Sequence, residues 1–244
     1  MKKIIIFFLL FLASCTHSNA SIPHGIRETF VKIEKTVDIL ICKEQKCRSD
    51  QSKIMGSGVV VGSRNKGAYV LTAAHVCESS AMLKTPNLKE YQIIINVVNL
   101  KEEKYLSEII DMNYALDTCI LFVHNFKNPV AKISLRSPMI GNRVYNIAAP
   151  ANIFYKNVVP ILEGFFNGNV EERQVAVYSI PATGGSSGSP IFNSHGHLVG
   201  MIHSVNVYFP VISISPTHKN LKNFITLTIR NDMRNDILIP RPQQ

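Results

Sequence analysis

A serine within a tract of small residues is the feature of this sequence most suited to chemistry. The tract reads T-G-G-S-S-G-S-P over residues 183–190, and its central hydroxyl belongs to Ser187. Its glycines let the backbone turn without side-chain bulk, so a hydroxyl can stand exposed with amide N–H groups beside it. Such a turn can present a nucleophile for acyl transfer, although most Gly/Ser-rich tracts are flexible loops.

Two further residues of suitable types precede the serine. His75 stands at the end of the apolar segment 68–74, and Asp117 opens the apolar run 118–123. Each has an ordinary explanation by itself, because such residues are common where strands end. Their order, His75, Asp117 and then Ser187, is nevertheless that of the catalytic triad on double β-barrels, whereas the serine comes first in α/β-hydrolases. The sequence therefore predicts a Ser-His-Asp hydrolase built on two β-barrels.

At these motifs the chain resembles the chymotrypsin-like, or trypsin-like, serine peptidases over about residues 30–230. The matching motifs are Ser57–Gly62, Thr72–His75, Asp117 with the strand after it, and Gly185–Pro190. The most similar variants are bacterial Deg-type proteases and staphylococcal-type glutamyl endopeptidases, which share the tight glycine-bounded strand and the serine turn. The resemblance implies an all-β fold of two six-stranded antiparallel barrels and a hydrolase that needs no cofactor.

The resemblance also implies a role for each residue. Ser187 is the nucleophile, and because its hydroxyl is too weak an acid to react unaided, His75 takes its proton and passes it to the leaving amine. Asp117 accepts the other ring N–H of His75 and is preferred to Asp111 because only Asp117 leads directly into an apolar strand, as in the family. The backbone N–H groups of Gly185 and Ser187 form the oxyanion hole.

A substrate pocket follows from comparison with the glutamyl endopeptidases. Those enzymes place a histidine one residue beyond a Gly-Ile motif, where it meets the substrate carboxylate, whereas here the run Gly200–His203 is one residue longer. Because side chains alternate along a strand, the offset turns His203 to the other face, towards Asp117 or simply half-buried. The residues expected around the pocket are Pro181, Ala182, Ile202 and Val205. They predict cleavage after small or medium aliphatic residues, with cleavage after glutamate as the alternative.

The first residues have the pattern of a secretory signal. Two lysines precede an apolar run, residues 4–12, that is too short to span a membrane as a helix. Residues 1–20 are therefore assigned to a signal peptide. The run L-A-S-C resembles the lipoprotein box and favours cleavage before Cys15 with lipidation of that residue, while ordinary cleavage after Ala20 is the alternative. We expect a protein of the bacterial cell envelope, held at the membrane by lipid on the periplasmic side or the surface, or else secreted.

Four cysteines follow the signal, and export to an oxidising compartment favours disulfides. Cys42 and Cys47 flank a polar turn, and Cys77 and Cys119 each lie two residues after a predicted triad member. We predict the pairs Cys42–Cys47 and Cys77–Cys119, against the alternative of four free thiols in a reducing cytosol. No C-x-x-C pair supports a zinc site.

The chain is basic, with a net charge of +9 that falls to +7 when Lys2 and Lys3 leave with the signal. Its basic residues are scattered and lack the aromatic interleaving of a nucleic-acid platform, which favours an ordinary solvated surface and no nucleic-acid partner. Attraction to anionic lipids or acidic substrates is the alternative. His195 and His197 stand in a Ser/Gly turn without a third ligand, so we predict no metal site.

Short β-branched runs between polar turns predict two sets of strands in a peptidase domain over residues 21–244. A short helix near residues 26–35 precedes them. The first barrel, about residues 30–125, takes the runs 36–41, 55–61, 68–71, 91–99, 105–112 and 119–123. The second barrel, about residues 139–230, takes the runs 143–147, 158–166, 173–179, 190–193, 197–204 and 207–213. An amphipathic helix at Lys219–Arg230 and a loose tail to Gln244 close the chain.

The sequence thus predicts an exported serine endopeptidase that acts on proteins or peptides. A surface lipoprotein that keeps the peptidase fold only for binding is the alternative from another class, and the complete triad argues against it. An esterase-type hydrolase is a second alternative. The triad order argues against the esterase, as does Ser189, which stands where a G-x-S-x-G motif needs its last glycine.

Overall fold

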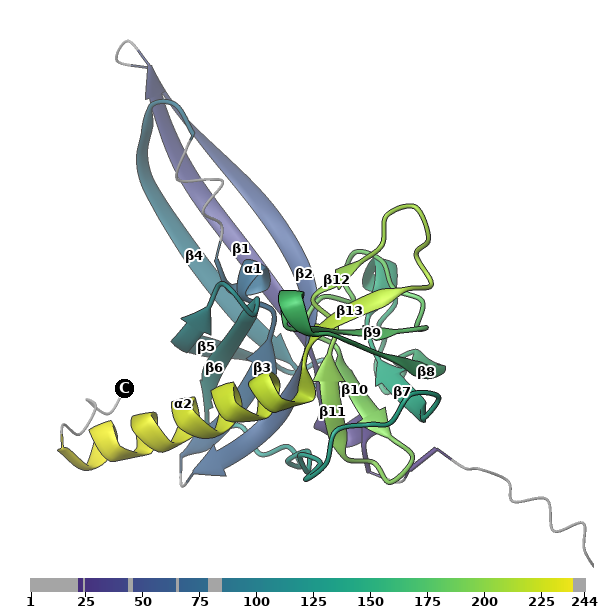
Figure 1. Ribbon diagram of the computed structural model, residues 1–244. Coiled ribbons are helices and arrows are strands. Elements are labelled where there is room, and N and C mark those ends of the chain that lie inside the picture. The colour runs from purple at the N-terminus through teal and green to yellow at the C-terminus, as the bar shows by residue number, and fades with distance from the viewer. Residues whose placement is uncertain (1–21, 24, 44–45, 65, 79–84, 239–244) are drawn as a thin grey trace, which may run out of the picture.

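The computed structural model describes residues 22–238, apart from residue 24, residues 44–45, residue 65 and residues 79–84. Two β-structures lie side by side, and a long C-terminal helix runs along the first of them (Figure 1). The predicted signal peptide, with Cys15 and Ala20, lies outside the described residues, as does the end of the predicted tail.

The first β-structure is a closed antiparallel barrel with the strand order β1-β2-β3-β6-β5-β4. Its strands are β1 Phe30–Lys43, β2 Lys46–Arg64, β3 Gly67–Thr72, β4 Leu88–Val98, β5 Lys104–Asn113 and β6 Thr118–His124. Each strand predicted for this barrel occurs. Strand β3 is buried along its whole length, and β6 is buried up to its last residue. Both faces of the barrel wall are therefore covered at β3 and β6, which explains why these two strands read as continuous apolar runs.

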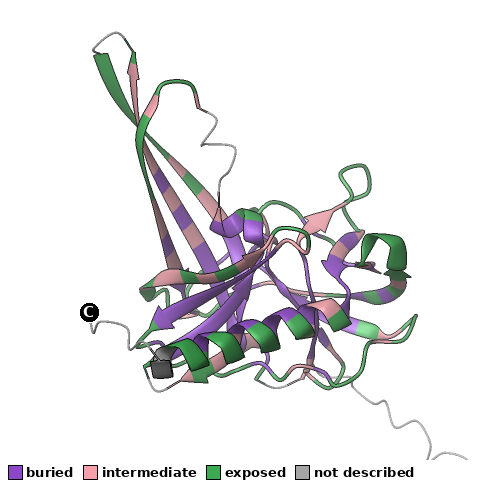
Figure 2. Ribbon diagram, turned by 60° about the vertical axis from the view of Figure 1, so that its left-hand side comes forward, coloured by how far each residue is buried: buried purple, intermediate pink, exposed green. Residues whose placement is uncertain are grey.

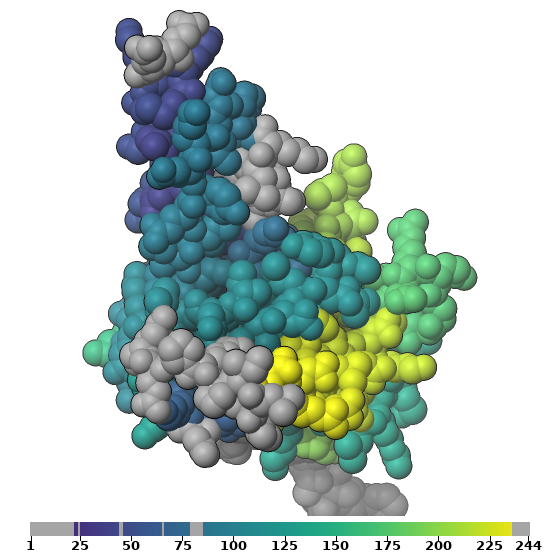
Figure 3. All heavy atoms as spheres, turned by 90° about the vertical axis from the view of Figure 1, so that its left-hand side faces the viewer, coloured from purple at the N-terminus to yellow at the C-terminus, as the bar shows by residue number. Residues whose placement is uncertain are grey.

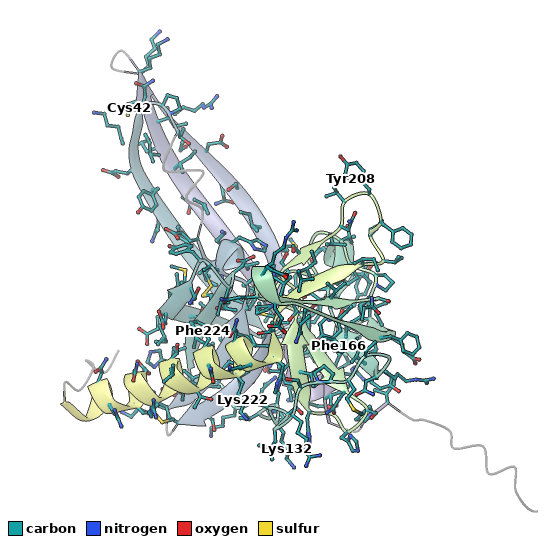
Figure 4. All side chains as sticks on the ribbon, viewed as in Figure 1. Cys42, Lys132, Phe166, Tyr208, Lys222 and Phe224 are labelled. Atoms are coloured by element: carbon teal, nitrogen blue, oxygen red, sulfur yellow. A yellow bond between two sulfur atoms is a disulfide. The ribbon has the colours of Figure 1, made fainter. Side chains whose placement is uncertain are left out.

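Strands β1, β2 and β4 continue beyond the barrel as an arm formed by residues 36–43, 46–54 and 88–93 (Figures 1 and 3). Strand β1 lies in the middle of the arm and pairs with β2 on one side and β4 on the other. Cys42 and Cys47 face each other at the far end, where they form the predicted disulfide (Figure 4).

The second β-structure is an antiparallel sheet of seven strands in the order β11-β10-β7-β8-β9-β13-β12. Its strands are β7 Arg143–Ile147, β8 Ile161–Val170, β9 Val175–Tyr178, β10 Pro190–Asn193, β11 Leu198–Met201, β12 Ser204–Val205 and β13 Ser213–Pro216. Only Ile202 and His203 separate the two edge strands β11 and β12 in the chain. The sheet therefore curls until its edges approach each other, and it takes the place of the predicted six-stranded second barrel with β12 as an additional strand.

The helix predicted near residues 26–35 is wrong for most of its length. A single turn of 3-10 helix, Arg27–Thr29, is followed at once by β1. Phe30 and Ile33 are fully buried in the barrel, and the chain pairs with β2 from Phe30 onwards. Burial and strand pairing therefore override the local preference for helix.

The strand predicted over residues 207–213 is also wrong, because residues 206–212 form an exposed loop and β13 begins only at Ser213. Asn206 explains the turn, since its side-chain oxygen accepts hydrogen bonds from the backbone N–H groups of Tyr208 and Phe209 at 3.0 and 3.1 Å. Figure 4 shows Tyr208 at the tip of this loop.

The C-terminal helix α2, His218–Leu238, is longer than predicted. Phe224 points towards the first barrel and is buried there, whereas Lys222 points away from it (Figure 4). Eight residues beyond Phe224, Asp232 is also buried; its carboxylate accepts a hydrogen bond from the Tyr69 hydroxyl at 2.7 Å and pairs with Arg64 at 3.2 Å. This buried contact holds the last turns of α2 where a loose tail was predicted.

Buried residues fill both β-structures and the junction between them (Figure 2). The larger cluster joins the barrel to second-sheet residues such as Ile147, Phe192 and Met201. The smaller cluster lies within the second sheet. In the part of the chain that the structure describes, no helix combines the length and apolarity needed to cross a membrane.

Candidate active site

Two segments at one end of the first barrel place His75 beside Asp117. His75 lies in the short helix α1, Ala74–Cys77, just after β3, and Asp117 is the residue before the neighbouring strand β6. The Asp117 Oδ2 atom lies 2.7 Å from His75 Nδ1, and Oδ1 accepts a hydrogen bond from the His75 backbone N–H at 2.9 Å. Asp117 has a φ of 49°, in the left-handed region that aspartate tolerates better than most residues, so the chain turns sharply here.

The surroundings of Asp117 favour its ionised form. Burial raises the pKa of the carboxyl, but hydrogen bonds from the side chain and backbone of His75 lower it by more, so the net pKa lies below the ordinary value. The carboxylate can therefore hold the imidazole with its proton on Nδ1, which leaves Nε2 as a proton acceptor. The His75 side chain is 48% exposed and thus accessible to a substrate.

The predicted disulfide between Cys77 and Cys119 is present, with the two Cα atoms 6.6 Å apart. It joins α1 to β6, so each cysteine lies two residues from a member of the His75–Asp117 pair. The bond therefore fixes the two segments that bring the imidazole and the carboxylate together.

Removing this disulfide in a Cys77→Ala/Cys119→Ala variant should lower the free energy of unfolding by about 2 to 4 kcal/mol, because it closes a long loop in the unfolded chain. Urea unfolding followed by circular dichroism measures the change. The matched control is Cys42→Ala/Cys47→Ala. These cysteines have a sequence separation of only 5 and lie at the far end of the arm, so removing their disulfide opens a much shorter loop. A larger loss of stability in the control than in the first variant would contradict this account.

Ser57 of β2 holds the serine turn. Its backbone N–H donates to the Ser187 carbonyl at 2.8 Å, and its hydroxyl donates to the Gly185 carbonyl at 2.8 Å. The same hydroxyl accepts a hydrogen bond from the Ala149 backbone N–H at 3.0 Å. The first residue of the S-G-V-V-V-G motif therefore ties the proposed nucleophile turn to the first barrel, a role that sequence reasoning did not assign to it.

Gly56 shows how closely the two parts of the site approach. A Cβ atom at this position would stand 2.8 Å from Val76 Cγ1 and 3.1 Å from the Ser187 carbonyl oxygen. The backbone of Ser187 and the residue after His75 therefore meet on either side of one glycine. Within the described ranges the Ser187 hydroxyl and the His75 ring share no hydrogen bond. Such contacts are often long without substrate and shorten in the reacting complex.

The backbone of the serine turn offers two unused donors. Ser186 and Gly188 donate their N–H groups to the carbonyls of Thr183 and Ile202, at 2.9 and 2.7 Å. By contrast, the N–H groups of Gly185 and Ser187 donate to no acceptor in the described part of the chain. Backbone amides in buried turns are nearly always paired, so these two amides beside a serine hydroxyl are free to donate hydrogen bonds to a further oxygen.

Comparison with protein-family models matches residues 56–201 to the trypsin-like peptidase domain, and the match covers more than half of the chain. The chain belongs to the trypsin-like peptidase family. Its structure is similar to the crystal structure of the serine endoprotease from Yersinia pestis, with a TM-score of 0.58 and 20% sequence identity. That alignment covers 81% of this chain and 63% of the endoprotease, and it supports a chymotrypsin-like fold. No curated protein matches the sequence.

The residues predicted around the substrate pocket of this peptidase differ in their burial. Ala182 and Ile202 are buried in the cluster within the second sheet, and Val205 packs against that cluster. Pro181 is exposed. The Ala182 N–H donates to the Pro210 carbonyl at 2.9 Å, which brings the exposed loop 206–212 beside this apolar wall.

His203 faces away from the apolar wall. Its Nδ1 atom lies 3.7 Å from Asp117 Oδ2, and its side chain is 16% exposed. The one-residue offset predicted from the strand pattern is the observed arrangement, with Ile202 in the apolar cluster and His203 beside the Asp117 carboxylate.

Lys35 of β1 contacts the backbone of α1, the helix that carries His75, and the sequence analysis gave this lysine no role. Its side chain is fully buried, and its ammonium donates hydrogen bonds to the carbonyls of His75 and Glu78 at 3.3 and 3.0 Å. Burial lowers the pKa of Lys35 to about 8, while the Glu78 carboxylate acts in the opposite direction. The lysine satisfies carbonyls at the end of α1 and so fixes the turn that carries His75. Because side chains alternate along a strand, Lys35 lies on the same face of β1 as the buried residues Ile33 and Val37. This alternation was the sequence signal that Lys35 is buried.

The two histidines of the predicted turn lie between β10 and β11, where the rings of His195 and His197 stack with centroids 6.3 Å apart. Within the described residues, no group of three or more His, Cys, Asp and Glu side chains is arranged to hold a metal ion.

Proposed function

We propose that this chain is an exported serine endopeptidase that hydrolyses peptide bonds through an acyl-enzyme on Ser187. The observation that carries the proposal is the 2.7 Å contact between His75 Nδ1 and Asp117 Oδ2, beside a turn with two unpaired amides. The site then offers a base oriented by a carboxylate, a hydroxyl nucleophile and donors for an oxyanion. These are the parts that acyl transfer requires.

The proposed reaction has two halves. In the first, Ser187 Oγ attacks the substrate carbonyl carbon while His75 Nε2 takes the hydroxyl proton, and the amides of Gly185 and Ser187 donate to the oxygen that becomes negative. The C–N bond then breaks, and His75 gives its proton to the departing amine. In the second half, water attacks the acyl carbon as His75 takes one of its protons, the Ser187–acyl bond breaks, and the proton returns to Ser187 Oγ.

We further propose an apolar specificity pocket formed by Pro181, Ala182, Ile202 and Val205. The burial of Ala182 and Ile202 in one apolar cluster supports it, as does the position of His203 beside Asp117 rather than in the cluster. A pocket of this kind favours small or medium aliphatic residues before the cleaved bond. Because one methylene group contributes only about 1 to 3 kcal/mol in such a pocket, selectivity should be loose.

Digestion of a diverse peptide library, read by mass spectrometry, tests both proposals. The chain from residue 21 onwards should cut after alanine, valine and other small aliphatic residues, and the Ser187→Ala variant should make none of these cuts. Ser194→Ala, which changes an exposed serine in the β10–β11 turn, is the matched control and should cut like the unaltered chain. Cuts after glutamate would overturn the pocket and leave the peptidase intact.

A fluorophosphonate probe separates the peptidase from its rival, a binding protein with the same fold. Labelling of Ser187 in the unaltered chain and in Ser194→Ala, but not in Ser187→Ala, would support the hydrolytic site. Absence of both cuts and label would overturn the peptidase and favour the binding protein.

Export and anchoring are supported by the sequence pattern of residues 1–20 and by the two disulfides, since disulfides persist in oxidising compartments. Lipidation of Cys15 would hold the peptidase at a membrane of the cell envelope, whereas cleavage after Ala20 would release it.

A further inference from the structure

His203 is a histidine that a Ser-His-Asp triad does not require, yet it shares the triad carboxylate. Its Nδ1 lies 3.7 Å from Asp117 Oδ2, the same oxygen that lies 2.7 Å from His75 Nδ1. The other carboxylate oxygen accepts the backbone N–H of His75 at 2.9 Å. Asp117 therefore faces two imidazoles through one oxygen and is held by the His75 backbone through the other.

The backbone around His203 belongs to the half of the molecule that carries the nucleophile. The carbonyl of Ile202 accepts the N–H of Gly188 at 2.7 Å, and the N–H of Ile202 donates to the Ser189 carbonyl at 2.9 Å. His203 itself donates its backbone N–H to Ile214 of β13 at 3.0 Å. The residue before the histidine, Ile202, is therefore hydrogen-bonded to the turn after Ser187. The His203 ring itself reaches across to Asp117 of the first barrel.

The titratable groups that face the His203 ring are Asp117, which precedes β6, and His75 of α1. Burial lowers the pKa of His203, Asp117 raises it, and His75 lowers it, so the net pKa lies below the ordinary value. The ring is therefore neutral at neutral pH and carries a single N–H that can be directed at one acceptor.

We propose that His203 is a positioning residue of the triad, whose neutral ring directs its Nδ1–H at Asp117 Oδ2 and so aligns the His75–Asp117 pair with the turn that carries Ser187. The inference rests on the proposed function. It assigns to a side chain of the second sheet the task of holding the carboxylate of the first barrel in register with the nucleophile.

His203 and His75 both approach the same carboxylate oxygen, Asp117 Oδ2. A second N–H on Oδ2 stabilises the carboxylate without His75, so the pair gains less when His75 becomes positively charged. Removing the donor from position 203 should therefore strengthen the attraction between Asp117 and a positively charged His75 ring, and should move the acid limb of the activity profile towards neutral pH.

The variants His203→Leu and His203→Asn form a matched pair, because leucine and asparagine are similar in size and neither titrates, but only asparagine keeps an N–H donor near the Nδ1 position. In His203→Leu we expect the acid limb of kcat/KM to move up by about 0.5 to 1 pH unit, which is about a 3- to 10-fold loss below that limb. The loss should fall on kcat rather than KM. His203→Asn should stay within about 2-fold of the unaltered peptidase.

Two measurements on the inactive Ser187→Ala protein need no catalysis. Nitrogen-15 NMR should show His203 with its proton on Nδ1, and a proton on Nε2 instead would overturn the proposal even if no variant at position 203 folds. NMR titration should show a higher His75 pKa when His203→Leu is added and an unchanged one with His203→Asn. Equal His75 titration in the two variants would also overturn it.

These outcomes separate the inference from the proposed function. If the unaltered chain neither cuts peptides nor takes the fluorophosphonate label, the proposed function fails, while the tautomer of His203 and its effect on the His75 titration are still read in the Ser187→Ala protein. If the chain cuts peptides and the leucine and asparagine variants have identical acid limbs, only the role of His203 fails.

Discussion

Replacing Ser187 with alanine should lower the turnover of a peptide substrate by about 10⁴- to 10⁶-fold. The change removes the oxygen that forms the bond to the substrate, and no neighbouring hydroxyl takes its place. Ser186 is buried, and its oxygen accepts the N–H of Thr183; Ser189 is buried, and its oxygen accepts from Asn146. Steady-state hydrolysis of the best library peptide, with enzyme in large excess for the variant, measures the loss.

The fold should survive this substitution, which makes the loss interpretable. The contact that holds the turn is the Ser57 N–H bonded to the backbone carbonyl of Ser187, and alanine keeps that carbonyl. Thermal unfolding of Ser187→Ala should therefore match that of the unaltered chain. A variant that folds and still hydrolyses peptides at a near-normal rate would show that Ser187 is not the nucleophile.

The parts of the site that the sequence predicted are those encoded in short stretches of chain. His75 and Asp117 could be selected because each stands at the end of an apolar run, and the order of the chain then indicated which double-barrel arrangement they belong to. The pairing of Cys77 with Cys119 followed from the same placement. The strand alternation that separates Ile202 from His203 is equally local, since it depends on a shift of one residue.

The parts that the sequence did not predict depend on contacts between distant segments. Lys35 appears as an ordinary strand lysine until α1 folds over it and offers two carbonyls. Ser57 joins Gly185 and Ala149, which lie far from it in the sequence, and no local pattern reveals such a partner. The extension of α2 has the same cause, because Asp232 is buried only when it meets Tyr69 of β3.

Local turns account for the remaining differences. The run after Asn206 is apolar enough to be a strand, but the Asn206 side chain accepts two backbone N–H groups and bends the chain before pairing can begin. Conversely, the segment from Phe30 onwards contains residues compatible with a helix, but it forms a strand because it pairs with β2. A single-sequence pattern weighs local preference alone, whereas the fold adds the burial that each alternative would achieve.

Gly185→Ala should lower kcat by about 10²- to 10³-fold, the loss typical of removing one oxyanion donor. Gly185 has a φ of +92°, and a Cβ atom there would stand 2.3 Å from the Ala149 carbonyl oxygen, closer than any real contact of this kind. The alanine must therefore rotate the peptide or displace the backbone at Ala149, which lies two residues after β7. Either movement turns the Gly185 N–H away from the position beside Ser187 that the reaction needs.

Gly184→Ala is the matched control for this prediction. A Cβ atom at Gly184 would meet nothing within 4 Å, and the same small methyl group is added one residue away. This variant should keep kcat within about 3-fold, because no oxyanion donor is lost. Stopped-flow hydrolysis of one peptide by both variants measures the contrast, and fluorophosphonate labelling should slow in parallel for Gly185→Ala alone. Equal losses in the two variants would mean that bulk in the turn, and not the direction of the Gly185 amide, limits the reaction.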